Sequence, residues 1–458
     1  MLLSRVSFRT LPLTAALALA FTSNVQAQSL VEMYEAARGY DAGFISAKAQ
    51  FEADLSKANQ ALGGILPNIA LTSSATRTFV DMRYDNPSVA PAGFVPSRFY
   101  GTYSGAVTLT QPIYQPASWV VYKQGGRLLE QSAAKFQASE QDLLVRVSQA
   151  YFDVLSSEDS LTLVQAQKKA VSEQLASAKR NFEVGTTTIT GVRDAQARFD
   201  LTHAQEIAAE NDLRIKRLAL DMMVGMSNVK PKRLANENQL VAAPKDGVET
   251  WVSQSEVANP NVRQAQLALE VATLEIDRAM AAHKPTLNAQ ISYAGTRNTG
   301  GTANTTTSTA ITDTHIFTPS ASLVLNVPLF AGFATHYRVK ETVSLEDKAR
   351  ADFENTKRST AQATRTAYFG LVAGLSQVMA YEAAEASSQS SLDANKLGYS
   401  VGVNINIDVL NAQSQLYQTK RDLAKARYDV LINTLKLRQA SGTLTSEDLQ
   451  SINSLLAP

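Results

Sequence analysis

Two segments of the chain alternate between apolar and polar residues. In TLNAQISYA (residues 286–294) and in YSGAVTLT (residues 103–110), apolar residues such as Ile291 and Val107 fall on one side, and Ser, Thr, Asn and Gln fall on the other. A period of two predicts β-strands with one apolar face. The pattern is a weak signature of transmembrane strands, and it is equally typical of half-buried strands in a soluble protein.

Residues 119–182 have a helical period instead. They contain no proline and only the Gly125-Gly126 pair of glycines, so one helix of about 64 residues would span about 96 Å. Apolar or small residues recur at an average spacing of 3.5, at Phe136, Leu143, Val147, Ala150, Val154, Leu161, Val164, Val171, Leu175 and Ala178. This spacing predicts coiled-coil packing. A simple two-stranded coiled coil would leave the strands unexplained.

Two glycine-containing turns end long helices, at FEVGTTTITGVRD (residues 182–194) and YSVGVNINIDVLN (residues 399–411). Gly185 and Gly402 permit the positive φ that terminates a helix. Return helices are expected over residues 192–224 and 409–439. Each pair forms a helical hairpin, and in a closed bundle the hairpin tips would face the axis.

The chain is duplicated. Tyr151-Phe152 recurs as Tyr368-Phe369, and Val184-Gly185 recurs as Val401-Gly402, both after 217 positions. Each copy has a helix, two strands, a long helix and a return helix, and the opening helices are predicted at residues 30–62 and 250–282. The predicted organisation is a first repeat (28–225), a connection (226–249), a second repeat (250–442) and a C-terminal tail (443–458).

Residues 1–27 have the pattern of a signal peptide. Arg5 and Arg9 precede an apolar run, and small residues end at Ala27, where cleavage is expected. The run is too short for a membrane anchor. No later stretch is long and apolar enough to span a bilayer as a helix. The mature chain is therefore expected to be either soluble outside the cytoplasm or inserted as a β-barrel.

Composition removes several classes of function. Lys and Arg total 43 against 42 Asp and Glu, so charge predicts no nucleic-acid binding. The chain has no cysteine, and its four histidines are dispersed, which excludes disulfides and argues against a metal site. Motifs for a nucleophilic serine, a phosphate loop or zinc are absent from the sequence. No cofactor and no enzymatic activity are expected.

The loops between the paired strands favour a membrane location. Residues 79–102 are rich in Pro, Gly and aromatic residues, and residues 298–318 are mostly Thr, Gly and Asn. Long polar loops on one side of a barrel suit an outer-membrane exterior. An interfacial aromatic girdle is expected at Phe99, Tyr100, Tyr103 and Tyr293.

The signal peptide, the duplication and the second turn with its return helix (VGVNINIDVLNAQSQLYQTKRDLAKARYDVLINTLKLRQASGTL) together resemble the TolC family of outer-membrane channel proteins. The resemblance covers nearly all of the mature chain and implies a mixed α+β membrane protein. Each of three protomers would give four transmembrane β-strands to one twelve-stranded β-barrel. The helices would form a long periplasmic coiled-coil barrel that docks with a periplasmic adaptor protein and an inner-membrane ABC or RND pump.

The implied function is a passive exit duct for tripartite efflux or type I protein secretion. The absence of a lipidated N-terminal cysteine resembles the secretion-capable branch of the family more than the acylated branch. A periplasmic coiled-coil adaptor or scaffold is the alternative, and it would have no membrane strands.

The resemblance also assigns a pore constriction. Asp408 matches a family aspartate that narrows the periplasmic tip, and Asn411 stands where the family has a second one. Three Asp408 side chains around a three-fold axis would attract cations and repel one another. Alternatively, Asp408 is an ordinary first-turn acid of its helix.

Tip-closing contacts depart from the family pattern. The family joins neighbouring hairpins with an Arg and an Asp, but the matching positions here are Asn404 and Gly191. Tyr399 matches the family's linking tyrosine but lacks the aspartate partner that this tyrosine has in the family. Asp194 is also expected among the residues that close the tip. The sequence therefore predicts a closed tip held by fewer ionic links.

Overall fold

The computed structural model describes residues 28–86, 88, 97–235, 244, 246–300 and 313–457. The predicted signal peptide lies outside the described residues. So do parts of the two polar loops and of the connection. The chain forms two compact units, which we call the first and second units. The first contains Met1–Ala47, Gln137–Asn259 and Ser359–Pro458, and the second contains Lys48–Phe136 and Pro260–Arg358.

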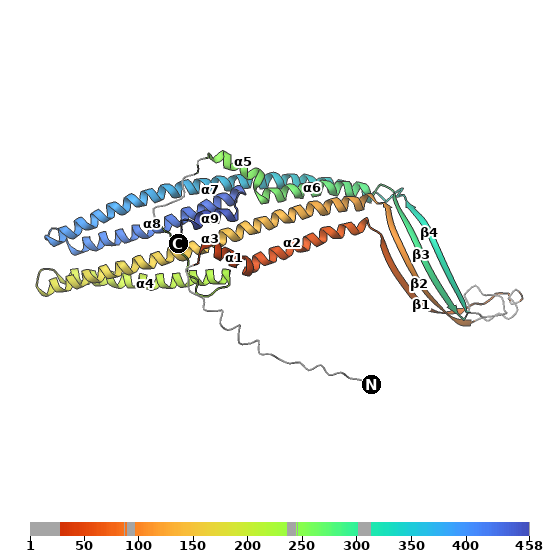
Figure 1. The fold of residues 1–458 in the computed structure, drawn as a ribbon, viewed down its shortest axis with the longest axis horizontal. Coiled ribbons are helices and arrows are strands. Elements are labelled where there is room, and N and C mark those ends of the chain that lie inside the picture. The colour runs from red at the N-terminus through yellow and green to blue at the C-terminus, as the bar shows by residue number, and fades with distance from the viewer. Residues whose placement is uncertain are drawn as a thin grey trace, which may run out of the picture. The chain divides into compact units, whose positions relative to one another are not determined.

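The same order of elements occurs twice along the chain (Figure 1). The first series is α1 (Leu30–Tyr40), α2 (Ala42–Gln60), the short 3₁₀ helix η1 (Ala61–Gly64), β1 (Asn68–Asp81), β2 (Ser97–Tyr114), α3 (Pro116–Glu183) and α4 (Ile189–Val224). The second series is α5 (Val248–Ala258), α6 (Pro260–Ala281), β3 (Thr286–Thr299), β4 (Thr314–Asn326), α7 (Ala334–Ser400) and α8 (Asn406–Ser441). A last helix, α9 (Ser446–Asn453), follows.

The four strands form one antiparallel sheet in the order β1-β2-β3-β4. Within each copy a strand pairs with the next, and β2 pairs with β3 across the two copies. Strands β1 and β4 are therefore the edges. Their outer backbone groups have no strand partner among the described residues.

One face of the sheet is apolar and uncovered. The register places Leu71 opposite Val107, and Val107 opposite Tyr293, so that these side chains share a face. Figure 1 shows none of the second unit's helices over either face. The exposed apolar side chains on this face are Ile69, Leu71, Phe79, Phe99, Tyr103, Val107, Ile291, Tyr293, Phe317, Leu323 and Leu325. These residues form a continuous apolar surface, unlike the single exposed apolar residues that are scattered over an ordinary protein surface.

The opposite face is polar. Ser74 and Ser104 hydroxyls lie 2.7 Å apart, and Ser292 and Ser320 hydroxyls lie 2.8 Å apart. These cross-strand hydrogen bonds repeat on both hairpins of the sheet. The period-two prediction for residues 103–110 and 286–294 is confirmed. Strand β2 extends beyond the predicted segment at both ends, whereas β3 begins at the predicted Thr286 and extends further only at its C-terminal end.

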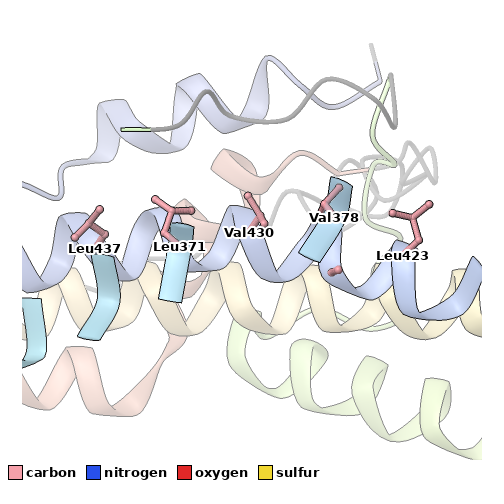
Figure 2. Close-up of a cluster of buried hydrophobic side chains, with 6 residues drawn as sticks. Leu371, Val378, Leu423, Val430 and Leu437 are labelled. Atoms are coloured by element: carbon pink, nitrogen blue, oxygen red, sulfur yellow. The ribbon is translucent and has the colours of Figure 1, made fainter. Parts of the chain in front are cut away.

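Coiled-coil packing holds the first unit together, as the spacing in α3 predicts. The predicted positions that are buried are Leu143, Val147, Val154, Val164, Val171, Leu175 and Ala178. The same repeat occurs in α8, where Val409, Leu416, Leu423, Val430 and Leu437 are buried at intervals of seven. Figure 2 shows three of these residues beside Leu371 and Val378 of α7, which are also seven apart. This is the spacing of a left-handed coiled-coil seam.

The predicted opening helix over residues 30–62 is broken at Asp41. Asp41 leaves the helical conformation, with ψ at 114°, and its Oδ1 accepts a hydrogen bond from the backbone N–H of Phe44 at 2.8 Å. The carboxylate also faces the guanidinium of Arg146 on α3, at 3.1 and 3.3 Å. Aspartate at this position ends α1 and caps α2.

The predicted opening helix over residues 250–282 is broken as well. Asn259 precedes Pro260, and a residue before proline is driven out of the helical region. Asn259 is extended, with φ at −68° and ψ at 125°, and Pro260 then begins α6.

The C-terminal tail has an ordered role that the sequence did not indicate. Helix α9 follows Gly442, and Leu456 forms a bridge with Leu234 of the connection between the repeats. Gly442 has φ at 79°, and a Cβ there would lie 2.5 Å from the backbone of Ala258. The tail therefore joins the end of the second repeat to the connection.

The ion pair at the first helix break generates a pH-dependent prediction. The hydrogen bond from Arg146 holds the pKa of Asp41 below its ordinary value of 3.8. A lowered folded-state pKa adds stability above pH 3.8, and this stability is lost as pH falls through the lower value. Asp41→Asn keeps an acceptor for Phe44 but removes the charge. We expect it to reduce the free energy of unfolding at pH 7 by about 1 kcal/mol, because solvent screens the half-exposed guanidinium.

Urea unfolding followed by circular dichroism at pH 7 and pH 2.5 measures the unfolding free energy of Asp41→Asn and of the native protein. The difference in unfolding free energy between Asp41→Asn and the native protein should be smaller at pH 2.5 than at pH 7, because the stability from the lowered pKa of Asp41 is lost progressively below pH 3.8. Asp277→Asn, at an exposed aspartate of α6, is the matched control and should change neither value. An Asp41→Asn deficit that persists undiminished at pH 2.5 would contradict the ion-pair explanation.

Candidate functional site

The two hairpin turns have the same backbone geometry. Gly185 has φ at 82° and Gly402 has φ at 79°. Beyond them, the Thr186 N–H donates to the Asn181 carbonyl at 2.8 Å, and the Val403 N–H donates to the Gly398 carbonyl at 2.9 Å. With the inner bonds from each glycine to the residue three before it, this is the Schellman arrangement. The turns therefore stop α3 and α7 at equivalent points.

The start of α8 packs in two directions. Val409 and Leu416 are buried against Leu392 of its own hairpin partner, α7. Leu410, which is fully buried, packs instead in the cluster of the first hairpin with Val171, Leu175, Ala178 and Ala195. One helix thus fixes the two hairpins of a protomer to each other near their tips.

Hydrogen bonds from side-chain amides reinforce this packing. Asn181 Nδ2, in the last turn of α3, donates to the hydroxyl of Tyr399 in the last turn of α7 at 3.1 Å. The Asn406 amide donates to the carbonyl of Gly191 at 3.4 Å and accepts from Gln174 of α3. Tyr399 and Gly191 therefore contact the other hairpin of the same protomer through neutral partners.

Asn411 contacts the first hairpin through a cation. Its Oδ1 accepts from Nη2 of Arg198 on α4 at 2.7 Å. Further along α8, Arg421 donates to Oε1 of Gln167 on α3 at 2.9 Å. Burial lowers the pKa of Arg421, because desolvation disfavours the charged guanidinium. The hydrogen-bond acceptors of this guanidinium are the side-chain oxygens of Gln167 and Gln418. At these two positions an arginine is paired with an amide oxygen.

Asp408 lies in the first turn of α8 and is partly exposed. Its Oδ2 accepts from the backbone N–H of Ile405 at 3.2 Å, which is the contact expected of a first-turn acid. Asn404 donates to Oδ1 of Asn395 on α7 at 2.9 Å, inside its own hairpin. Asp194 is exposed on α4. The single chain thus does not bring Asp408, Asn404 and Asp194 together.

Sequence reasoning missed the amide partners Asn181, Gln174 and Asn406. One signal was available. Asn181 precedes Gly185 by four residues and Tyr399 precedes Gly402 by three, so both lie in the last turn before equivalent glycines. Side chains at the same height on adjacent hairpins can reach each other.

No cluster of three or more histidine, aspartate and glutamate side chains that could hold a metal ion occurs in the described part of the chain. No described helix combines the length and the apolar character needed to cross a membrane.

The turn geometry generates a prediction about Gly402. Alanine there would be forced into the left-handed region, although its Cβ would meet no other atom. We expect Gly402→Ala to lower the free energy of unfolding by about 1 kcal/mol. Gly370→Ala, at an exposed interior position of α7 with open space around the added Cβ, should instead raise it by about 0.5–1 kcal/mol. Thermal unfolding of the two variants checks this, and equal shifts would refute the role of φ.

Comparison with known proteins identifies the family. The model of the outer membrane efflux protein family matches residues 33–226 and 251–443. Outer membrane protein TolC of Vibrio cholerae is 31% identical over 446 residues, covering 97% of this chain and 98% of that protein. The alkaline protease secretion protein AprF of Pseudomonas aeruginosa is 28% identical over 433 residues, covering 93% and 87%.

A solved structure has the same fold. The Campylobacter jejuni CmeC outer membrane channel superposes with a TM-score of 0.74 at 15% identity, covering 93% of this chain and 90% of that one. These matches confirm the predicted outer-membrane location and efflux function. The matching family is one of efflux proteins rather than of enzymes. The chain belongs to the outer membrane efflux protein family.

Proposed function

We propose that three copies of this chain assemble into one passive exit duct across the outer membrane. In this assembly the four-stranded sheets join into a twelve-stranded β-barrel, and the helices enclose a water-filled passage in the periplasm. The observation that carries the proposal is the sheet itself, which has one apolar face, one polar face and two edges that no other described strand pairs with.

The edges require closure. In lipid, unpaired backbone N–H and C=O groups are costly, so an open sheet cannot remain there alone. Strands β1 and β4 have 14 and 13 residues, which is enough to cross a bilayer when tilted. Pairing β1 of one copy with β4 of the next is a head-to-tail contact that closes into a ring. Two copies would give eight strands and a filled interior, whereas three leave a lumen lined by the Ser and Thr face.

The helices offer a matching head-to-tail interface. The described part of α4 exposes Ile207, Ile215, Leu218 and Met222, and the same unit's part of α7 exposes Phe369, Val372, Met379 and Leu397. Exposed apolar residues spaced along a helix indicate a partner helix. Contact between α4 of one copy and α7 of its neighbour would bury both sets.

The tip would then narrow the passage. Asp408 and Asn411 lie at the start of α8, and a three-fold axis would bring three copies of each residue together. Within each protomer, the neutral contacts of Tyr399 and Gly191 would hold the two hairpins together. Between protomers, Asn404 and Asp194 would contact the neighbouring hairpin. Opening in this case requires exchange of amide hydrogen bonds, with little dependence on a charge pair.

An inner-membrane ABC or RND pump would supply the energy for transport, and a periplasmic adaptor protein would join this pump to the passive duct. Tripartite efflux and type I secretion use the same passage. The secretion role is supported by the likeness to AprF, whose name refers to alkaline protease secretion. The family assignment argues against the adaptor alternative. Deleting the gene tests the two roles: loss of one exported protein alone indicates secretion, and broad hypersensitivity to toxic small molecules indicates efflux.

The lipid-facing assignment predicts that lysine is tolerated at only one of two neighbouring residues. Leu71 is on the apolar face and 76% exposed, whereas Thr72 is on the polar face. Lysine on the lipid side near the bilayer midplane costs about 2–4 kcal/mol. We expect Leu71→Lys to reduce the yield of heat-resistant trimer in the outer membrane, and Thr72→Lys to leave it unchanged. Equal trimer yields on fractionation and gel electrophoresis would contradict the assignment of the faces.

The proposed constriction predicts a change in ion selectivity. Asp408→Asn removes three negative charges from the ring, so cation preference and block by divalent cations should both fall severalfold. Single-channel recording in planar bilayers measures both quantities. The control is Asp393→Asn, at an exposed aspartate of α7. Unchanged selectivity in Asp408→Asn would remove Asp408 from the ring.

A further inference from the structure

The apolar face of the sheet contains a notch. Ser73, Gly105 and Gly295 form one cross-strand row, so three adjacent strands carry almost no side chain at this level. A Cβ added at Gly105 would meet nothing within 4 Å. The hollow has a volume of about 510 Å³.

Larger side chains wall the notch. Leu71 and Val107 lie on one side, and Tyr103 lies on the side toward the loops. At the β4 end, the ring of Phe317 lies over Gly295, 3.2 Å from where its Cβ would be, and stacks on Tyr293. Gly295 is thus covered by Phe317, whereas Gly105 and Ser73 leave the floor open.

Two arginines and a histidine lie at the loop end of the notch. Arg297 and His315 are paired directly in the β3–β4 register, in the row next to the notch. Arg77 lies in the following row on the same face, with its guanidinium 5.2 Å above the ring of Phe99. Same-face rows are about 7 Å apart, so these groups lie about 7–14 Å from the floor of the notch.

The arginines keep donors available for an anion. Arg297 contacts Asp313 at 3.5 Å, but its side chain is 55% exposed, so this surface pair is weak. A guanidinium has five N–H donors in a fork that matches phosphate oxygens. An arginine facing lipid rather than water needs such a partner.

We propose that this notch binds one acyl chain of a phosphorylated lipid of the loop-side leaflet, and that Arg297, His315 and Arg77 bind its phosphate. The assignment rests on the proposed membrane orientation of the apolar face. An apolar slot that leads within two rows to two arginines and a histidine matches a lipid in both shape and charge. A free anion would use only the cationic end, and a neutral lipid only the slot.

The test uses the full-length trimer in detergent and diphosphoryl lipid A as the probe, with fully dephosphorylated lipid A for comparison. Native mass spectrometry counts bound lipids during titration. The native trimer should bind the phosphorylated form at least about fivefold more tightly. Arg297→Gln and Arg77→Gln should each weaken binding of the phosphorylated lipid about fivefold. Gly105→Val should weaken binding of both lipids, because the valine side chain fills the notch.

Arg98→Gln is the matched control, because the register with Val80 places Arg98 on the polar face at the same end of the sheet. It should bind both lipids like the native trimer. If the native trimer forms channels in bilayers yet binds both lipids equally, the lipid site is wrong and the proposed duct stands. If the protein forms neither trimers nor channels, the duct fails and the lipid site fails with it.

Discussion

Backbone hydrogen bonding at the edges of the sheet is the constraint on which the proposed architecture depends. Strands β1 and β4 each present a row of donors and acceptors that the described chain does not pair. The apolar face beside them is uncovered, so this sheet is not built to remain alone in water. In the proposed trimer, edge-to-edge pairing with identical copies would satisfy the backbone, and insertion into lipid would remove the apolar face from water. The proposed trimer, its membrane insertion and its polar lumen all rest on these four strands.

The sequence predicted the features that depend on local periodicity. Alternation around Val107 and Ile291 located the strands, and the seven-residue spacing in α3 located the coiled-coil seam, because both patterns are set by which side chains must be buried. Gly185 and Gly402 marked the turns, since few other residues tolerate positive φ. The seven-residue spacing of Leu416, Leu423 and Val430 could have predicted the equivalent seam in α8.

Features that depend on long-range side-chain contacts were not predicted. The carboxylate of Asp41 at the helix break is also bound by Arg146, which lies far along the chain, and the tail forms a bridge between Leu456 and Leu234 of the connection. At the tip, Asn181 and Asn406 are common residue types with no distinctive spacing, so their roles emerge only when the two hairpins are placed side by side. At the tip, the sequence predicted fewer ionic links than the family pattern has, but it did not identify the amides, the hydroxyl and the arginine that join the two hairpins of this chain.

The most direct test of the architecture is disulfide cross-linking between the two edges, for which the absence of native cysteine gives a clean background. Ser74→Cys in β1 is combined in turn with Cys at Ile316, Thr318, Ser320 and Ser322 in β4, to sample the register between copies. Oxidation in outer-membrane preparations should yield covalent trimers for at least one pair, with either single variant remaining monomeric on denaturing gels. Monomers throughout the series would contradict closure of the sheets into one barrel.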